Sequence, residues 1–261
     1  IRAVGNGETI ENVTVNYTQG RTWPAPYTVD FRDYTDLQDV LDDGKIEIVD
    51  GEWYLDDGWL RPSVIGYDRL VALGDVNWEN FDIKLLLHLE EFPLGGQGGV
   101  GILYRWQGHI EATPGEQPLT GWWESGAYAF YRHRNPEPTD PTDFGSRLEM
   151  FYQHFSKVED NSGFRVKRSE PYYFKLRVQT KDAAPHGLYS FRVWEADEPE
   201  PAGWTFEVAD ETPDWLPTGS LLLVAHEADV RFGSVEVVPI IDLEVSSVGS
   251  GTVNVSPELS G

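Results

Sequence analysis

The 261-residue sequence contains no cysteine, and this absence excludes several classes of protein at once. Disulfide frameworks, thiolate zinc sites, iron–sulfur clusters and cysteine nucleophiles all require thiols. Long apolar runs are missing as well. A stretch such as residues 221–225 is far shorter than the ~20 apolar residues that a membrane-spanning helix needs.

Basic residues are scarce beside acidic ones. The sequence has 20 Lys and Arg against 44 Asp and Glu, which gives a net charge of −24. A chain with no cation surplus cannot release counterions from a polyphosphate, so we exclude nucleic acid as a partner. The acidity also fits an extracellular or salt-exposed setting. We therefore expect a protein that is secreted or held at a cell surface, with no membrane insertion.

Patterns with a period of two residues dominate the chain, and helical patterns are nearly absent. Asp-Gly steps at 43–44, 50–51 and 57–58 are typical of tight hairpins between short strands at 45–49, 52–55 and 59–61. One short helical turn is predicted at 35–41. The other predicted strands are 10–17, 81–89, 99–106, 126–132, 147–155, 172–180, 189–195, 204–208, 220–225 and 233–241. These elements predict an all-β fold, a two-sheet antiparallel jelly-roll sandwich.

The composition divides the chain into three parts. Residues 20–241 hold the aromatic-rich strands and form the predicted jelly-roll domain. Residues 1–19 are interpreted as the end of a preceding Ig-like module or a linker. Residues 242–261 contain no aromatic residue and are rich in Ser, Gly and Val, and this change of composition indicates the start of a following small β-repeat module. We therefore expect a module of a larger protein.

Five segments carry a resemblance to a known family. They are GEWYLDDGWL at 51–60, NFDIKLLLHL at 80–89, GGVGILYRWQ at 98–107, YYFKLRV at 172–178 and LLLVAHEADVRFGSVEV at 221–237. In this order they resemble strands of the concanavalin A-like lectin/glucanase superfamily. Within that superfamily, their sequence pattern is most similar to the laminin-G-like and thrombospondin-C-like modules of secreted bacterial or archaeal multidomain proteins. The resemblance implies a fold and not a chemistry. Most members bind carbohydrate or serve adhesion, and a minority are glucanases or polysaccharide lyases.

A sugar-binding site needs a flat aromatic face and planar hydrogen-bonding groups at its edge. Trp122 and Trp123 follow a Pro/Gly-rich insertion at the start of a predicted strand. Arg105, Tyr131 and Arg147 lie within predicted strands, where they are expected to line one sheet face. We predict these five residues as the binding site for a polysaccharide or cell-surface glycan, with no catalytic residue.

Two other functions stay open from the sequence. The first is a structural spacer or adhesion domain without a sugar site. The second is a polysaccharide lyase or glycoside hydrolase. The segment 147–154 places Arg147, Glu149, Phe151 and Gln153 on one face of a strand, but it lacks the arrangement of the lyases, and the acidic run at 195–201 is broken by proline.

The one ion that the sequence favours is calcium. Aspartates crowd residues 30–36 and 39–43 and offer hard oxygen ligands, although no calcium-loop consensus is present. The resemblance implies the same ion, because calcium commonly pins strands in these families. A structural calcium ion is therefore the expected cofactor, with no other.

Overall fold

The computed structural model describes residues 25–93, 97–107, 127–134, 145–152, 156–168, 170–211 and 216–240. Strands take up 54% of these residues and helices 5%. The strand pairs are antiparallel, which confirms the predicted all-β class. No helix within these ranges is long and apolar enough to cross a membrane.

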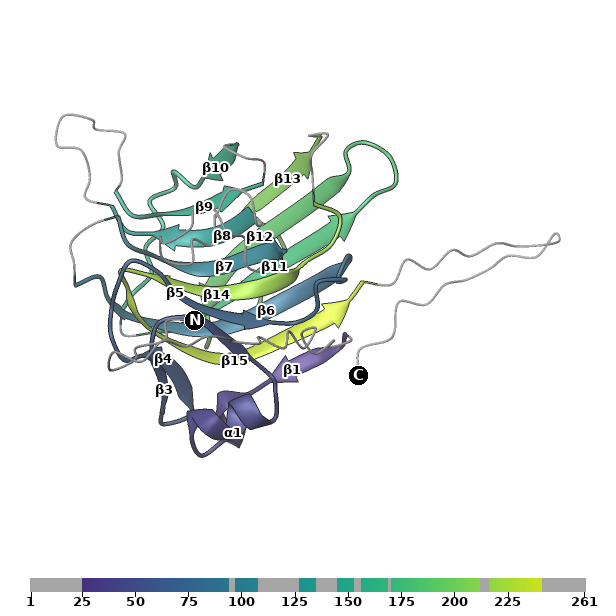
Figure 1. The fold of residues 1–261 in the computed structure, drawn as a ribbon. Helices are drawn as coiled ribbons and strands as arrows, with labels where there is room; N and C mark the ends of the chain where they lie inside the picture. The colour runs from purple at the N-terminus through teal and green to yellow at the C-terminus, as the bar shows by residue number, and fades with distance from the viewer. Residues whose placement is uncertain are drawn as a thin grey trace, which may run out of the picture.

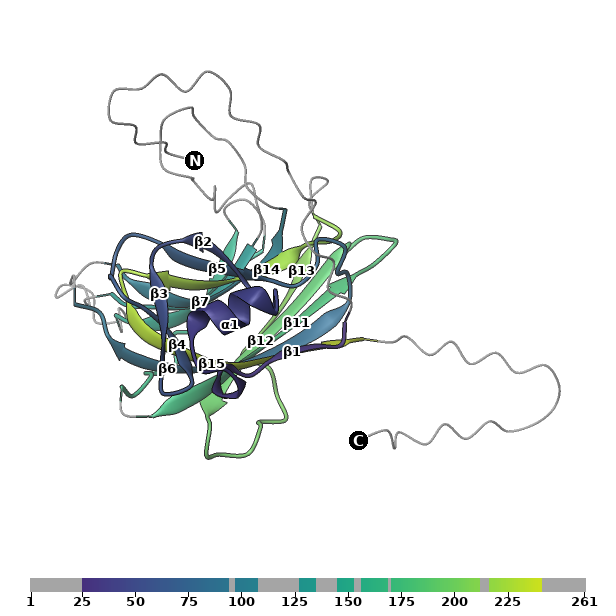
Figure 2. The same cartoon turned by 60° about the horizontal axis from the view of Figure 1, so that its bottom comes forward.

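The strands form two layers (Figures 1 and 2). Sheet A has eight strands, and β1 (Tyr27–Val29) joins it by pairing with β15. The other strands of sheet A follow in the spatial order β13 (Phe206–Asp210), β12 (Gly187–Glu195), β11 (Pro171–Thr180), β6 (Phe81–Glu91), β15 (Asp229–Pro239), β4 (Trp59–Pro62) and β3 (Trp53–Asp56). Sheet B follows the order β10 (Lys157–Glu159), β9 (Arg147–Phe151), β8 (Ala127–Arg132), β7 (Gly99–Trp106), β14 (Ser220–His226), β5 (Arg69–Leu73) and β2 (Glu47–Asp50).

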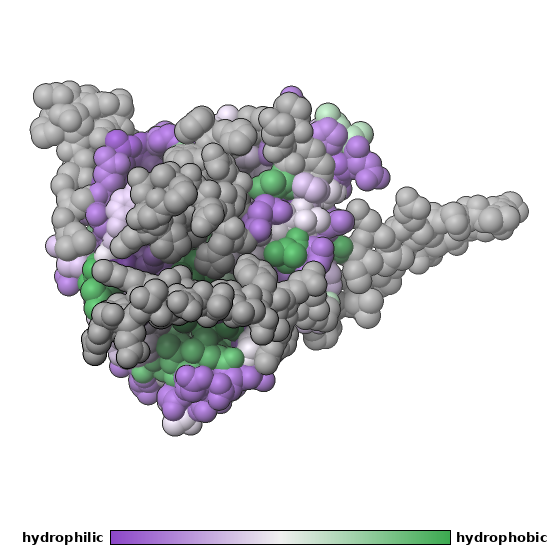
Figure 3. Space-filling model, in the orientation of Figure 1, coloured by the Kyte–Doolittle hydropathy of each residue, from purple (hydrophilic) through white to green (hydrophobic). Residues whose placement is uncertain are grey.

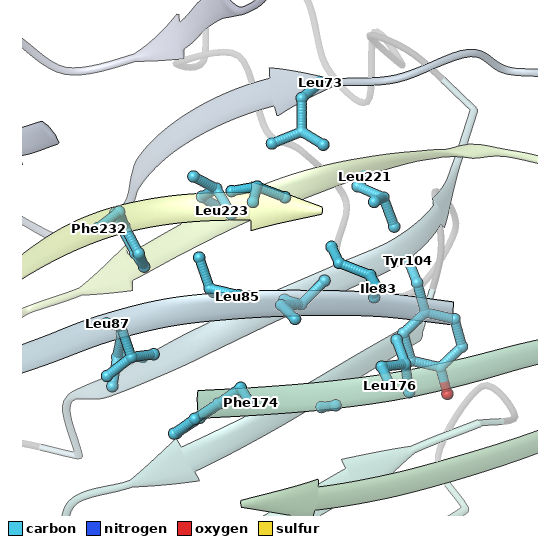
Figure 4. Packing of buried hydrophobic residues seen from close by; sticks show 14 of the residues in the cluster. Leu73, Ile83, Leu85, Leu87, Tyr104, Phe174, Leu176, Leu221, Leu223 and Phe232 are labelled. Carbon is cyan, nitrogen blue, oxygen red and sulfur yellow. The ribbon is translucent and has the colours of Figure 1, made fainter. Parts of the chain in front are cut away.

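The core lies between the sheets because one face of each strand is apolar. In β6, buried and half-buried residues alternate along nearly the whole strand, and Ile83, Leu85 and Leu87 are fully buried. Figure 4 shows these side chains close to Leu221 and Leu223 of β14, on the opposite sheet. Burying a leucine or isoleucine side chain in this way stabilises the fold by about 1.5–3 kcal/mol.

The sequence located most strands within a few residues and missed three. Strand β7 has the predicted limits, and β6, β11, β12 and β14 run one or two residues longer than expected. The missed strands are β1, β5 and β10. β1 and β10 have three residues each, and the buried run of β5, Leu70–Leu73, shows no alternation. Short strands and uniformly apolar ones carry little period-two signal.

The hairpin between β3 and β4 shows how an Asp-Gly step sets the chain direction. Asp57 has φ of 52° and Gly58 of 78°, so both central residues are left-handed, as a two-residue hairpin turn requires. A side chain at Gly58 would also meet the side chain of Arg32 at 2.6 Å. The turn therefore depends on glycine for its backbone angle and for space.

The predicted helical turn is α1 (Leu37–Asp42), preceded by the 3-10 turn η1 (Phe31–Asp33). Figure 2 shows α1 beside the strands, and its Val40 is buried in the core. The surface over this region is hydrophilic at the bottom of Figure 3. Its aspartates have local structural roles: Asp30 caps η1, Asp36 caps α1, and both accept hydrogen bonds from backbone N–H groups.

The described chain enters and leaves sheet A at one place. Tyr27 in β1 is the register partner of Val237 in β15, so residues 25 and 240 lie at the same end of this strand pair (Figure 1). The predicted flanking segments, 1–19 and 242–261, lie outside the described residues. Their assignment to neighbouring modules stays a prediction.

Truncating one core side chain tests the packing between the sheets. Leu85→Ala removes a fully buried side chain from the central strand β6 and is expected to lower the free energy of unfolding by about 2–5 kcal/mol. Urea denaturation followed by tryptophan fluorescence measures the loss. Val238→Ala, at a site that is 44% exposed on the same sheet, serves as the control. An equal loss in both variants would contradict the burial described here.

Candidate functional site on the outer face of sheet B

Sheet B has an outer face that points away from sheet A. On β9, Leu148 and Met150 belong to the core between the sheets, so Arg147, Glu149 and Phe151 point outward. This alternation confirms the predicted shared face of these three residues. Gln153, predicted on the same face, lies outside the described residues.

Register partners on successive strands form three rows of positions across this face. The polar row consists of His226, Gly99, Arg132 and Arg147, extended by Asp68, which is bonded to His226. The middle row consists of Leu70, Val224, Gly101, Phe130, Glu149 and Glu159. The apolar row consists of Ala72, Leu222, Leu103, Tyr128, Phe151 and Lys157.

The apolar side chains of this face form a cluster of their own, separate from the main core. Its members all come from sheet B and include Trp106, Tyr128 and Phe130, which are at most 5% exposed. Tyr128 stacks on Phe151 with ring centroids 4.2 Å apart. Burial raises the pKa of Tyr128 above its ordinary value, so its hydroxyl stays neutral. These rings form the floor of the face, and the side chains of the polar row are partly accessible beside them.

Arg132 connects the three rows. Its Nε lies 3.0 Å from Glu149 Oε2, and its other nitrogens donate to the Gln97 carbonyl at 2.9 Å and to the Tyr128 hydroxyl at 3.3 Å. The guanidinium also lies 5.2 Å from the centroid of the Phe130 ring. Because Glu149 is only 2% exposed, the ion pair with Arg132 compensates for the burial of its carboxylate.

Arg147 is held in a second ion pair beside the first. It donates to Glu159 Oε2 at 2.9 Å and to the Gly145 carbonyl at 3.1 Å, and Lys157 also contacts Glu159. Partial burial acts to raise the pKa of Glu159, but the hydrogen bonds and charges of Lys157 and Arg147 outweigh it and lower that pKa. Glu159 is therefore a carboxylate acceptor and not a proton donor.

The other end of the polar row holds an imidazole and a carboxylate. His226 Nδ1 lies 2.9 Å from Asp68 Oδ1, and both side chains are about one-eighth exposed, at 12% and 13%. The ring of Tyr67 stands edge-on to the His226 ring at 4.7 Å. Gly99, between His226 and Arg132 in the row, has no side chain. The ring of Phe130 fills the space beside it, because a side chain at Gly99 would lie 1.8 Å from that ring.

The five sequence-predicted site residues are not brought to one face. Arg147 lies in the polar row. Tyr131 points the opposite way, into the core between the sheets, where it is 3% exposed. Trp122 and Trp123 lie outside the described residues. Sequence reasoning placed Glu149 on the face of Arg147 but missed Arg132, Asp68 and His226, because only the register between strands brings these residues into one row.

Arg105 is also turned away from this face, for a different reason. The register between β7 and β14 shifts at this point, so that Arg105 is the extra residue of a bulge, with φ of 58°. Its side chain is 1% exposed and bonds to Thr180 Oγ1 at 2.8 Å and to the Pro217 carbonyl, with the guanidinium 5.5 Å from the centroid of the Tyr189 ring. Arg105 thus links the two sheets, and one expected groove residue is instead internal.

The outer face of sheet A has a different character, because its charges are paired along the strands. Arg177 makes a two-pronged contact with Asp82, both bonds at 2.7 Å. Glu200, from the loop after β12, pairs with Lys175 and Arg192, and Trp204 of the same loop lies 4.1 Å from Arg192. The loop covers part of this face. Sheet B is the candidate site because its outer face brings two arginines and a histidine into one row.

The described residues contain no group of three or more His, Asp or Glu side chains placed to hold a metal ion. The aspartates that the sequence marked for calcium are engaged locally: Asp30 with Arg32, Asp36 with the α1 backbone and Asp43 with the Tyr34 hydroxyl. The calcium expectation therefore gains no ligand set from these ranges.

Comparison with known structures defines the fold class. The metal-free form of the Emp46p carbohydrate recognition domain matches with a TM-score of 0.52 and 12% identity, over 85% of this chain and 100% of that domain. A mutant of the same domain gives 0.51, with the same identity and coverage. The legume lectin-like domain from Entamoeba histolytica gives 0.48 and 9% identity, over 87% of this chain and 100% of that one.

The chain thus has a concanavalin A-like lectin fold, which confirms the expected jelly roll. No protein-family profile matches the sequence, and no curated protein matches it. At 12% identity the likeness is one of fold, so function has to be argued from the outer face of sheet B.

A comparison of ion pairs tests whether the Arg132–Glu149 pair is buried. Arg132→Met leaves the Glu149 carboxylate 2% exposed without its arginine and is expected to lower the free energy of unfolding by about 3 kcal/mol. The double variant with Glu149→Met should recover most of that loss. Lys84→Met, in an exposed pair with Glu236, should cost less than about 1 kcal/mol. Chemical denaturation measures all three, and equal losses in the two single variants would refute a buried pair.

Proposed function

We propose that the chain is a non-catalytic carbohydrate-binding module of a larger extracellular protein, and that it binds a polysaccharide or cell-surface glycan at the polar row of sheet B. The observation that carries the proposal is this row of recessed planar groups, Asp68, His226, Arg132 and Arg147, on a lectin fold. Carboxylates, imidazoles and guanidinium groups match the paired hydroxyls at the edge of a pyranose ring.

Preorganisation favours binding at this row. Each of its arginines is held by a carboxylate and a backbone carbonyl, so little side-chain freedom is lost when a ligand binds. Emp46p supports the proposal at the level of fold, because the matching part of that protein is described as a carbohydrate recognition domain.

The carboxylates argue against glycoside hydrolysis. Glu149 and Glu159 are register partners on one face, an arrangement that a hydrolase could use, but that chemistry needs one carboxyl to carry a proton. Both are in ion pairs with arginine, and the pKa of Glu159 is lowered. Glu195 from the acidic run at 195–201 is bonded to Lys167. The residues that face the row are therefore suited to accepting hydrogen bonds.

The position of the described ends argues against an in-line spacer. Because Tyr27 and Val237 are register partners, a parent chain would enter and leave the domain side by side. Such a domain projects from its parent and adds little to its length, which suits presentation of a binding face.

We propose an extracellular location because the net charge of −24 suits an extracellular or salt-exposed setting. Any calcium ion would be structural, because the carboxylates of this face already have partners.

Binding and cleavage can be separated in one experiment. In native gels that contain soluble polysaccharides, the wild-type chain is expected to be retarded by at least one polymer and to release no reducing ends from it. Arg147→Ala should weaken the retardation, because it removes a planar donor from the polar row. Arg177→Ala, which removes a carboxylate-paired arginine from sheet A, is the matched control. Release of reducing ends by the wild type would replace binding with catalysis.

The sequence-predicted tryptophans supply a further test. The double variant Trp122→Ala, Trp123→Ala is expected to lose ~1–3 kcal/mol of binding if either indole stacks on the sugar, by analogy with ring stacking on other planar ligands. Trp59→Ala, on sheet A, is the matched control. Fluorescence titration with a retarding polysaccharide measures both. Unchanged affinity in the double variant would remove these two residues from the site.

A further inference from the structure

We propose that Tyr67 is the stacking platform of this site, with the His226–Asp68 pair beside it as hydrogen-bonding edge, and that its ligand is a neutral pyranose polymer. The inference rests on the proposed function and names a residue and a ligand class for it. None of these three residues was among the sequence-predicted sugar contacts.

Exposure sets Tyr67 apart from the other described aromatic side chains. It is 67% exposed, whereas Tyr54, the other large exposed aromatic of the described ranges, is 38% exposed. Most rings of the two sheets lie in the core or in the apolar cluster. A ring that is open on one face is what the apolar side of a sugar requires.

The loop that carries Tyr67 is fixed in place. Arg69 donates from Nε to the Val64 carbonyl and from Nη1 to the Asp68 carbonyl, each at 2.7 Å. The backbone N–H of Glu227 donates to the Gly66 carbonyl at 2.8 Å, and a side chain at Gly66 would lie 2.0 Å from the Arg69 guanidinium. The exposed ring is thus presented by a braced loop, so a ligand would meet a preorganised surface.

The polar side chains of His226 and Asp68 lie beside the Tyr67 ring, where the polar row begins. Tyr67 stands edge-on to His226 at 4.7 Å, at an angle of 78°, which keeps the ring of Tyr67 upright beside the polar row. The bond between His226 and Asp68 at 2.9 Å fixes the imidazole. Beyond Gly99 the row continues to Arg132. A sugar stacked on Tyr67 therefore has the His226 imidazole and the Asp68 carboxylate beside it as hydrogen-bonding groups.

Charge selects the ligand class. The chain carries −24, and the cations of the polar row are already paired with carboxylates. A polyuronate would be repelled at long range, and the two arginines that it would have to recruit already have carboxylate partners. A neutral polymer meets neither penalty.

The test uses affinity electrophoresis of the full chain in gels containing mixed-linkage β-glucan, arabinoxylan, galactomannan or polygalacturonate. Tyr67→Ala is expected to weaken binding about tenfold or more to the neutral polymer that retards the wild type. Tyr67→Phe should keep that affinity, because it keeps the stacking face. Tyr54→Ala, on sheet A, is the matched control and should bind as the wild type does.

The outcomes separate the two proposals. Retardation of the wild type with equal retardation of Tyr67→Ala would overturn the role of Tyr67 and leave the proposed function standing. Retardation by polygalacturonate alone would overturn the neutral ligand class. No retardation in any gel would contradict the proposed function and the inference with it. The unfolding midpoint of each variant confirms its fold, and a 67% exposed ring should alter it little.

Discussion

The alternation of side chains in sheet B is the constraint on which the rest of the structure depends. Each strand offers one set of residues to the core and the other to the outer face, and the register between strands turns those sets into rows. A shift of one residue on β9 would put Leu148 and Met150 outside and bury Arg147 and Glu149. The hydrophobic core and the polar row are therefore fixed by the same pairing.

Most of the fold was accessible from the sequence because its signals are local. Period-two patterns and Asp-Gly steps are properties of neighbouring residues, and they located β6, β7 and the β3–β4 hairpin. The candidate site was only partly accessible. Arg147 was placed correctly on the outer face, since Leu148 and Met150 mark the buried side of its strand. Tyr131 was harder, because β8 has aromatic residues on both faces and no clear buried side.

Arg105 shows a second limit of sequence reasoning. A single bulge residue changes the direction of a side chain without changing the residues around it. Only the partner strand, β14, reveals the extra residue, and that partner lies more than a hundred positions away in the chain. The outcome is an arginine that ties β7 to the end of β11 through Thr180. Long-range register was the missing information.

The pairing of β1 with β15 has a mechanical consequence. Tension applied through residues 25 and 240 pulls on the two strands from the same end, at Tyr27 and Val237. The ladder bonds then carry the load one after another, as in the opening of a zipper, and not all together as in shear. Because β1 contributes three residues, a small extension releases it and transmits the pull to Phe31 and η1, which pack on β15 and β4. The first part of the domain to yield under load therefore belongs to sheet A, so the polar row of sheet B can keep its geometry while the domain is under tension.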